Sequence, residues 1–424
     1  MFIAANQSKR FLFLQGPPGP FFRELAKALE DRGMDTHRIN ICGGDAYDWP
    51  ERSVNYRGGR RKWPIFFDRY VRTHEITDLV LFGDCRPMHQ IALRMARMRG
   101  VHIHVFEEGY IRPDWMTLER DGVNGHSPIE RNPEIILSQA KWLPDVPNLP
   151  RITASFKRRA HDSFWHYYHV VVRKFAYPFY SSHRQGSLAL DGIGWLIKLA
   201  RKGRRARQAE QTLMLIKRKQ YFLFPLQLSG DYQIRAHSPF GSMVIAVEYV
   251  LESFAKFAAA DAVLVVKEHP LDSSYRNWRT TIAHMAKKLG VADRVHHMDG
   301  GDLGELASKA RGMVCVNSTS GTLGLEVGRP VIALGEAVYD VEGITHQLGL
   351  DTFWTQPQYP DDKLYRAFKR MIHAKCLVRG GLASKSGVAT LVKNSVRRLL
   401  SDDGLPVMPV RELSTEETNL ILRA

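Results

Sequence analysis

The chain has 424 residues, of which 44% are hydrophobic and 10% aromatic, and its formal net charge is +16. This length and composition exclude a disordered or fibrous chain and allow two globular domains, each with its own core. The four cysteines lie far apart, which argues against a zinc site and a disulfide framework and fits a reducing cytoplasm. No run of about 18 apolar residues occurs, and the apolar run near the N-terminus is too short for a signal peptide, so we expect neither a membrane-spanning helix nor a leader.

Apolar strand patterns alternate with helical patterns over residues 1–148. The strand patterns are RFLFLQG, THRINIC, DLVLFG and VHIHVFEEGY, and the helical patterns include PFFRELAKALEDRG and MHQIALRMARMRG. Such alternation, with glycine at the strand ends, predicts a parallel, doubly wound sheet. We therefore expect residues 1–148 to form an N-terminal Rossmann-like domain.

Residues 149–218 form a basic and aromatic segment with helical patterns. Between Arg151 and Gln220 there are 16 Lys and Arg residues against 3 Asp and Glu, so most of the net charge lies here. Trp195 and Leu196 stand beside Lys198 and further arginines, a pattern typical of an interfacial amphipathic helix. A solvated linker and a surface for partner proteins remain alternatives, and nucleic acid is not expected because no nucleic-acid motif occurs. We favour contact with an anionic membrane surface.

A second alternating unit covers residues 219–405, followed by a C-terminal tail at 406–424. Its strand patterns are YFLFPLQ, AVLVVKEHP, RVHHM and MVCVN, and the helical pattern of residues 242–260 is the longest in the unit. Two Rossmann-like domains that face each other across a cleft, with a basic helical insertion between them, are the architecture of GT-B glycosyltransferases. The sequence predicts this α/β fold.

Polar residues follow the predicted strands, and in an open parallel sheet ligands bind beyond the carboxyl ends of the strands. In the first domain they are Gln15, Gly16, Glu107, Glu108 and Arg112. In the second domain they are Gln227, Asp231, Lys267, His269 and the turn from Asn317 to Gly321. Structural roles remain open for each, because glycines permit tight turns and a lone histidine is often only hydrogen-bonded. No Asp-x-Asp triplet occurs, so we expect no divalent metal and no cofactor.

The turn Ser318-Thr319-Ser320-Gly321 lies between a buried strand and a predicted helix that carries Glu326. A helix N-terminus has unsatisfied N–H groups and a positive dipole end, which suit a phosphate. The alternative is that the hydroxyl groups only cap the helix. If the two domains face each other, this turn and His269 are expected to hold the phosphate of a sugar nucleotide, Glu326 its ribose and Lys267 a carboxylate of the sugar.

The segments FLFLQGPPGPFFRELAKALEDRG, FEEGYIRPDWMTLERDGVNGHS, FPLQLSGDYQI, VVKEHP and NSTSGTLGLEVGRPVIALG carry a family resemblance. In this order they resemble the bacterial capsule polysaccharide biosynthesis/export family, in particular its KpsS-type β-Kdo glycosyltransferases. The resemblance implies a retaining transferase that moves Kdo from CMP-β-Kdo to lyso-phosphatidylglycerol and so starts the poly-Kdo linker of a capsule. It also implies a cytoplasmic protein, peripheral on the inner face of the inner membrane, with the acceptor on the N-terminal domain and the nucleotide sugar on the C-terminal one.

Carried over residue by residue, the resemblance places the functional acid on Glu107 and an aspartate on Asp231, with Gln227 before it. Retention through two inversions makes Asp231 the expected nucleophile and Glu107 the base for the acceptor hydroxyl. His269 is expected to stabilise the leaving phosphate. Arg112 or Arg235 is a candidate for the Kdo carboxylate from its charge alone.

Two other functions remain open at this stage. A non-catalytic scaffold of a capsule export complex would bind a nucleotide sugar or a nascent polymer without transferring it. A transferase for another CMP-sugar, such as a sialic acid, would need the same residue types, because the two sugars share the carboxylate and the CMP group.

Overall fold

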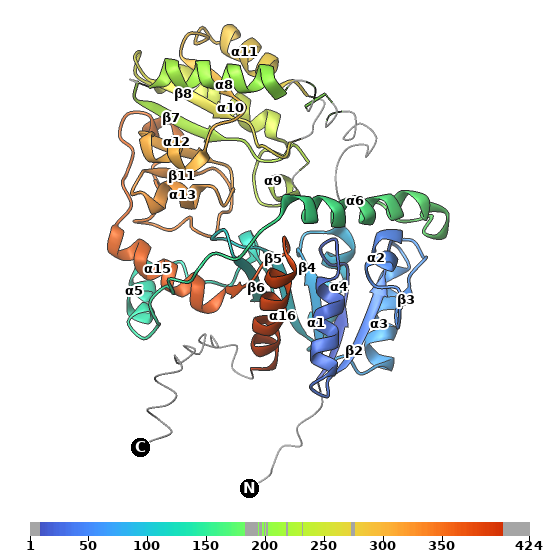
Figure 1. Ribbon diagram of the computed structural model, residues 1–424. Coiled ribbons are helices and arrows are strands. Elements are labelled where there is room, and N and C mark those ends of the chain that lie inside the picture. Colours follow the sequence, from blue (N-terminus) through green and yellow to red (C-terminus); the bar gives the residue numbers. More distant parts are fainter. Residues whose placement is uncertain are drawn as a thin grey trace.

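The computed structural model describes residues 9–182, 194, 197, 198, 200, 202–217, 219–230, 232–272 and 276–401. These residues form two α/β domains, each built around its own sheet, which lie one above the other in Figure 1. The predicted α/β fold with two Rossmann-like domains is confirmed.

The first sheet has seven strands in the order β12-β6-β5-β4-β1-β2-β3. The five strands from β3 to β5 in this order run parallel, and β6 and β12 add an antiparallel edge. The strands are β1 (Arg10–Phe13), β2 (Asp35–Asn40), β3 (Val54–Asn55), β4 (Asp78–Phe82), β5 (His102–Glu108), β6 (Trp115–Arg120) and β12 (Leu377–Arg379).

Successive side chains of the central strands are buried on opposite faces of the first sheet, which must therefore be covered on both sides. Phe11 and Phe13 pack in one core with α1 (Phe21–Glu30) and α16 (Lys385–Leu400). Leu12 and Leu14 pack in another core with α3 (Trp63–Thr73) and α4 (Pro87–Met98). The shorter elements of this part of the chain are α2 (Gly43–Asp48), η1 (Asn124–His126) and α5 (Pro133–Ala140).

The second sheet has five parallel strands in the order β11-β10-β7-β8-β9. They are β7 (Tyr221–Pro225), β8 (Val263–Lys267), β9 (Val295–Met298), β10 (Gly312–Cys315) and β11 (Val331–Ala333). The helices that accompany it are α8 (Lys202–Ile216), α9 (Tyr232–Ala236), α10 (Met243–Phe257), α11 (Trp278–Lys288), α12 (Leu303–Lys309), α13 (Gly321–Glu326), α14 (Leu350–Phe353) and α15 (Asp362–Lys375).

The chain returns to the first domain near its C-terminal end. Strand β12 pairs with β6, and α16 lies beside α1 at the bottom of Figure 1. Residues 377–401, which the sequence interpretation assigned to the second domain, thus complete the first sheet and one of its cores. The apolar pattern of these residues predicts a helix but does not show which sheet the helix covers.

Helix α6 (Phe156–Val172), followed by η2 (Lys174–Ala176), belongs to the basic segment, as α8 does. It lies across the top of the first domain in Figure 1 and packs on α2. Close packing is possible because Gly43 and Gly44 have no side chains: a Cβ on Gly43 would lie 2.2 Å from the backbone oxygen of His169. The glycines after β2 thus serve helix packing.

Candidate active site

The carboxyl ends of the two sheets meet where the domains touch. Cys85 follows β4 and His237 follows α9, and the Cys85 Sγ lies 3.0 Å from the His237 Nε2. On the same side, a Cβ on Gly125 would lie 2.2 Å from both His237 and Glu336, so only glycine permits this approach of the two domains. The edges that the sequence predicts to face each other are therefore in contact.

Glu107 is the last residue but one of β5 and is partly buried at this edge. Burial raises the pKa of its carboxyl group to about 7, and the negative charges of Glu108 and Asp84 add to the effect. The backbone N–H of Glu108, at 3.0 Å, and the positive charge of Arg86 oppose it. A carboxyl group with this pKa exchanges a proton readily at neutral pH, which suits a general base.

Glu108 and Arg112, two predicted substrate contacts, have different surroundings. Glu108 forms an ion pair of 3.0 Å with Arg159 of α6, which attaches that helix to the end of β5. The exposed Arg112 donates to the backbone oxygen of Gly109 at 3.2 Å. Its positive charge is one of the causes that lower the pKa of His269 in the second domain. The loop after β5 thus faces the end of β8.

Gln15 and Gly16 follow β1 at the same edge of the first sheet. Gln15 is buried and donates from its side-chain amide to the Cys42 Sγ and to the Tyr180 hydroxyl, at 3.4 and 3.5 Å. A Cβ on Gly16 would lie 2.7 Å from the Phe22 ring. Both residues therefore have structural contacts, and their predicted contact with substrate stays a prediction.

Lys267 and His269 come at the end of β8. Lys267 is 5% exposed, and burial lowers its pKa. Burial also lowers the pKa of His269 to about 4, so the ring is neutral at physiological pH. Its Nδ1 accepts the backbone N–H of Leu271 at 3.1 Å, which leaves the proton of the neutral ring on Nε2. His269 can therefore donate a hydrogen bond from Nε2 without carrying a charge.

Gln227 and Asn317, two predicted nucleotide-sugar contacts, are hydrogen-bonded to each other. The Gln227 amide donates to the Asn317 Oδ1 at 2.8 Å, and the Asn317 backbone N–H donates back at 3.2 Å. The Asn317 side-chain amide donates to the backbone oxygens of Gln233 and His237. Asn317 thus holds the ends of β7 and β10 to α9, which is a positioning role that the sequence pattern does not reveal.

The hydroxyl-rich turn forms the start of α13, a helix of only six residues. The Ser318 Oγ accepts from both the backbone N–H and the hydroxyl of Ser320, at 3.1 and 2.8 Å. Ser320 is the N-cap residue but makes no side-chain capping hydrogen bond, and the Thr319 backbone oxygen accepts from Thr322. Gly321 is required because a Cβ there would lie 2.2 Å from the Tyr339 hydroxyl. The Ser320 side chain therefore does not cap α13, and the predicted phosphate contact of the turn stays a prediction.

Glu326, predicted to bind a ribose, ends α13 and points its exposed carboxylate at α15. Both of its oxygens lie 2.9 Å from the Lys369 Nζ. Arg235 of α9 stacks over the Tyr232 ring. Asp231, the predicted nucleophile, lies outside the described residues, directly before α9.

Several residues that the sequence interpretation did not choose as site residues occupy the junction of the domains. They are Asp84, Cys85, His126 and His237. The Asp84 Oδ2 lies 3.0 Å from the His126 Nδ1, and the rings of His126 and His237 are 4.5 Å apart. Asp84 and Cys85 follow a buried strand, which is a signal visible in the sequence, whereas no sequence pattern pointed to the two histidines.

The basic segment divides between the two domains. Of the basic residues predicted to face a membrane, Lys198 and Arg205 both form ion pairs with Glu268, at 3.6 and 3.7 Å, and Arg205 also pairs with Asp299. Trp195 and Leu196 lie outside the described residues. Of the described basic residues at and near α8, Lys198 and Arg205 therefore bind the second domain.

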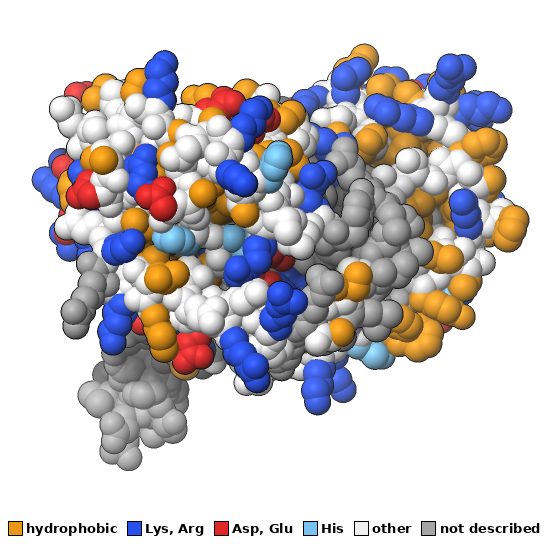
Figure 2. Space-filling model, turned by 90° about the horizontal axis from the view of Figure 1, so that it is seen from above, with side chains coloured by type: hydrophobic (Ala, Val, Ile, Leu, Met, Phe, Trp, Pro, Cys, Tyr) orange, Lys and Arg blue, Asp and Glu red, His pale blue; other side chains and the backbone are white. Residues whose placement is uncertain are grey.

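Helix α6 and η2 expose an apolar stripe. Phe164, Tyr168, Val171 and Phe175 follow helical spacing and are between 46% and 97% exposed. Arg173 and Lys174 are exposed beside them. In Figure 2, hydrophobic side chains gather with Lys and Arg on the right, the side to which α6 extends in Figure 1. An exposed apolar stripe with flanking cations is typical of a membrane-surface helix.

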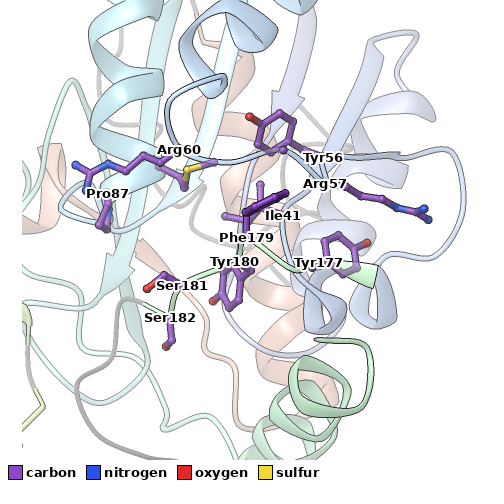
Figure 3. Close-up of a pocket in the computed structure, with 12 residues that line it drawn as sticks. Ile41, Tyr56, Arg57, Arg60, Pro87, Tyr177, Phe179, Tyr180, Ser181 and Ser182 are labelled. Atoms are coloured by element: carbon purple, nitrogen blue, oxygen red, sulfur yellow. The ribbon is translucent and has the colours of Figure 1, made fainter. Parts of the chain in front are cut away.

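A cavity adjoins this stripe. It lies between the segment after η2 and the edge of the first sheet, and Ile41, Tyr56, Tyr177, Phe179 and Tyr180 contribute to its lining. Figure 3 shows Ile41 and Phe179 near its centre, with Arg57 directed away from it. The exposed Phe179 connects the cavity with the surface around α6. Among the described residues, each helix is too short or too polar to cross a membrane.

Comparison with known proteins identifies the family. Residues 77–382 match the family described as capsule polysaccharide biosynthesis protein. The chain belongs to this family. It is 31% identical over 376 residues to the capsule polysaccharide export protein KpsS of Escherichia coli, covering 87% of this chain and 96% of that protein. It is 34% identical over 380 residues to the capsule polysaccharide modification protein LipB of Neisseria meningitidis serogroup B, covering 87% of this chain and 90% of LipB. The family resemblance predicted from the sequence motifs is confirmed.

Solved structures with a similar fold are more distant. The KpsC β-Kdo 2,7 transferase of Thermosulfurimonas dismutans has 13% sequence identity and a TM-score of 0.45, covering 91% of this chain and 99% of that one. The β-Kdo 2,4 transferase of the same KpsC has 12% identity and a TM-score of 0.41, covering 92% and 99%. A UDP-N-acetylglucosamine 2-epimerase from Listeria monocytogenes has 10% identity and a TM-score of 0.31, covering 93% and 95%.

Proposed function

We propose that the protein is a retaining β-Kdo transferase. It moves Kdo from CMP-β-Kdo to a glycerol hydroxyl of lyso-phosphatidylglycerol and so starts the poly-Kdo linker of a capsular polysaccharide. The observation that carries the proposal is the Glu107 carboxyl group, whose pKa of about 7 suits it to accept the proton of that hydroxyl where the two domains meet. The family motifs and the named capsule relatives support the same conclusion.

The reaction proceeds in two displacements at the anomeric carbon of Kdo. First, the Asp231 carboxylate forms a bond to this carbon, the bond to the phosphate oxygen breaks, and CMP leaves with the electron pair. Then the acceptor hydroxyl attacks the same carbon, gives its proton to Glu107 and releases the Asp231 carboxylate. Two inversions give net retention of configuration.

His269 and Lys267 stabilise the departing CMP. The neutral His269 ring donates from Nε2 to a phosphate oxygen, because its Nδ1 is already occupied by the Leu271 N–H. The turn from Ser318 to Gly321 offers further hydroxyl and N–H groups to the phosphate, and Glu326 accepts from the ribose after it releases Lys369. Arg112, whose charge reaches His269, is favoured over Arg235 for the Kdo carboxylate.

The lipid acceptor is reached at the inner face of the bacterial inner membrane. Phe164, Tyr168, Val171 and Phe175 enter the interface, and Arg173 and Lys174 attract anionic headgroups, each contributing about 1 kcal/mol. The cavity that Tyr56, Tyr177, Phe179 and Tyr180 help to line has a volume of about 110 Å³, which has room only for the end of an acyl chain. The acceptor is thus held by the same domain that carries Glu107.

The test uses purified protein, CMP-Kdo generated in place and lyso-phosphatidylglycerol, with products weighed by mass spectrometry. We expect a lipid product that carries Kdo in wild type and none in Asp231→Ala, while both bind CMP. If wild type binds CMP-Kdo but forms neither lipid product nor free CMP, the protein is a scaffold. If only CMP-sialic acid gives product, the proposed donor is wrong, but the proposal that the protein is a glycosyltransferase is correct.

A further inference from the structure

Four side chains that the proposed reaction does not use lie together at the junction of the domains. Asp84 and Cys85 follow β4, His126 ends η1, and His237 comes from the second domain. One donor atom of each lies within 4.8 Å of the other three. We propose that these four residues hold a divalent metal ion, preferentially zinc, and that this ion joins the two domains.

The donor atoms of the four residues lie close together. The Asp84 Oδ1 lies 3.2 Å from the Cys85 Sγ, which lies 3.0 Å from the His237 Nε2, and the Asp84 Oδ2 lies 3.0 Å from the His126 Nδ1. Zinc bonds to such ligands are about 2.0–2.3 Å, which places neighbouring ligand atoms about 3.3–3.8 Å apart. These contacts are shorter than in an occupied site, and they involve both oxygens of Asp84, so the side chains must rearrange for an ion to enter.

The neighbouring groups orient these ligands. The His237 Nδ1 lies 2.8 Å from the Glu336 carboxylate, so the proton of the neutral ring sits on Nδ1 and the Nε2 lone pair faces the cluster. A carboxylate behind a histidine is the usual arrangement at a zinc site, because it holds the ring in place and makes it a better ligand. Asp84 is held by the backbone N–H of Val123 at 3.1 Å.

The electrostatics favour a cation. Asp84, Cys85 and His237 are each at most 3% exposed. The carboxylates of Asp84, Glu107 and Glu336 add negative charge around the Cys85 thiol. When the ion binds, the Cys85 S–H bond breaks, a metal–sulfur bond forms, and the proton leaves to solvent. His126, whose side chain is 52% exposed, leaves a path for the ion.

A second cluster in the described residues has similar ligand types but opposite surroundings. Cys42, Asp45 and His166 also have donor atoms within 4.8 Å of one another. However, the Arg38 guanidinium lies 3.3 Å from the Asp45 carboxylate and already supplies the positive charge. His166 uses its Nδ1 on Asp48, at 2.7 Å. We expect no metal there, which makes Cys42 a matched control for Cys85.

A metal at the first cluster would revise the expectation, drawn from the sequence, that the chain has no zinc site. That expectation rested on the lack of paired cysteines, but this set takes one cysteine, two histidines and one aspartate from three segments far apart in the chain. Four protein ligands leave no open position for substrate, so the ion is structural. It would fix the contact between the domains that brings Glu107 opposite the nucleotide-sugar domain.

The full chain is purified without chelators, and elemental mass spectrometry measures the zinc bound to it. We expect about one zinc per chain in wild type and in Cys42→Ser, and at least about tenfold less in Cys85→Ser. Cobalt should replace zinc and give a thiolate charge-transfer band in wild type and Cys42→Ser only. Chelation should lower the thermal unfolding midpoint of these two proteins and not that of Cys85→Ser.

Two outcomes overturn the proposal. One is a wild-type chain that binds no zinc on titration, and the other is a Cys85→Ser protein that binds as much zinc as Cys42→Ser. If Cys85→Ser does not fold, His126→Ala replaces it, because this half-exposed ligand can be removed with the core intact. Zinc content does not depend on transfer, so a negative result here leaves the transferase proposal standing, and the reverse also holds.

Discussion

The guanidinium of Arg159 lies 3.0 Å from the carboxylate of Glu108, and this ion pair separates the roles of two consecutive acids. Glu108 is the anchor of α6 on β5. Glu107, on the other face of the strand, has a pKa raised to about 7 by burial. The family resemblance singled out Glu107, and the structure adds a physical difference between the two acids, because Glu108 is paired with Arg159 whereas Glu107 has a strongly raised pKa.

Replacing these two acids in turn tests this division. We expect Glu107→Gln to lower kcat by about 10²-fold or more, because the acceptor hydroxyl loses its base. Glu108→Gln should change kcat by less than about threefold, because Glu108 pairs with Arg159 of α6 and is not the group that accepts the proton of the acceptor hydroxyl in the proposed reaction. Steady-state transfer to lyso-phosphatidylglycerol measures both. Equal losses in the two variants would contradict the assignment of Glu107.

The raised pKa of Glu107 predicts the pH dependence of transfer. A base works when deprotonated, so kcat/KM should rise with pH through about 7 and then level off. Stability should change in the opposite sense. The folded pKa lies above the ordinary value, so the contribution of this carboxyl is fully present below pH 4.5 and is lost as pH rises through about 7. Thermal melts should therefore show Glu107→Gln gaining stability over wild type at pH 8 but not at pH 4; no such difference would contradict the shift.

His269 should act as a neutral donor. We expect His269→Ala to lower kcat/KM by about 10²-fold, because the leaving phosphate loses a hydrogen bond in the transition state. Its pKa is lowered to about 4, so its charge does not change between pH 5 and 8. Calorimetry between pH 5 and 8 should therefore find the same pH dependence of CMP affinity in wild type and in His269→Ala. CMP binding that tightens below pH 6.5 in wild type alone would show a charged His269 instead.

The apolar stripe on α6 and η2 should govern membrane binding. We expect the double variant Val171→Glu/Phe175→Glu to bind phosphatidylglycerol vesicles at least about tenfold more weakly, because two apolar insertions are lost and negative charge is added. Vesicle flotation measures this, and high salt should weaken the wild type as well.

Met98→Glu is the matched control for the stripe. Met98 is 72% exposed at the end of α4, on the edge of the sheet opposite α6. Its variant should float like wild type, and all variants should transfer Kdo equally to a short-chain, water-soluble acceptor. Equal vesicle binding by the stripe variant and the control would contradict the membrane role of α6.

Two glycine substitutions should shift stability in opposite directions. Gly43→Ala forces a Cβ within 2.2 Å of the His169 backbone oxygen, so we expect a loss of about 1–3 kcal/mol in unfolding free energy. Gly203→Ala in α8 meets no atom within 4 Å and should gain up to about 1 kcal/mol through helix propensity. Urea unfolding followed by circular dichroism compares them. An unchanged Gly43→Ala midpoint would show that α6 is not held against α2.

Much of the architecture could be predicted because strand–helix alternation is a local property. Apolar spacing predicted the strands at RFLFLQG and DLVLFG and the helices that follow them, and the parallel strands of both sheets formed as expected. The antiparallel edge of β6 and β12 in the first sheet differs from the predicted all-parallel sheet. Strand β12 could not be predicted, since its three residues gain their place only by pairing with β6 across some 260 residues of chain. The pairing of Gln227 with Asn317 was hidden for the same reason: amide side chains look alike whether they bind substrate or each other.

The sequence by itself determined the fold class, the family and the concentration of basic residues between the two domains, because these follow from local periodicity, motif order and charge. Tertiary structure alone decided which acid is buried, which cations are already paired and which distant cysteine and histidines lie together. Burial and proximity depend on how far-separated segments pack, and no short window of sequence records them.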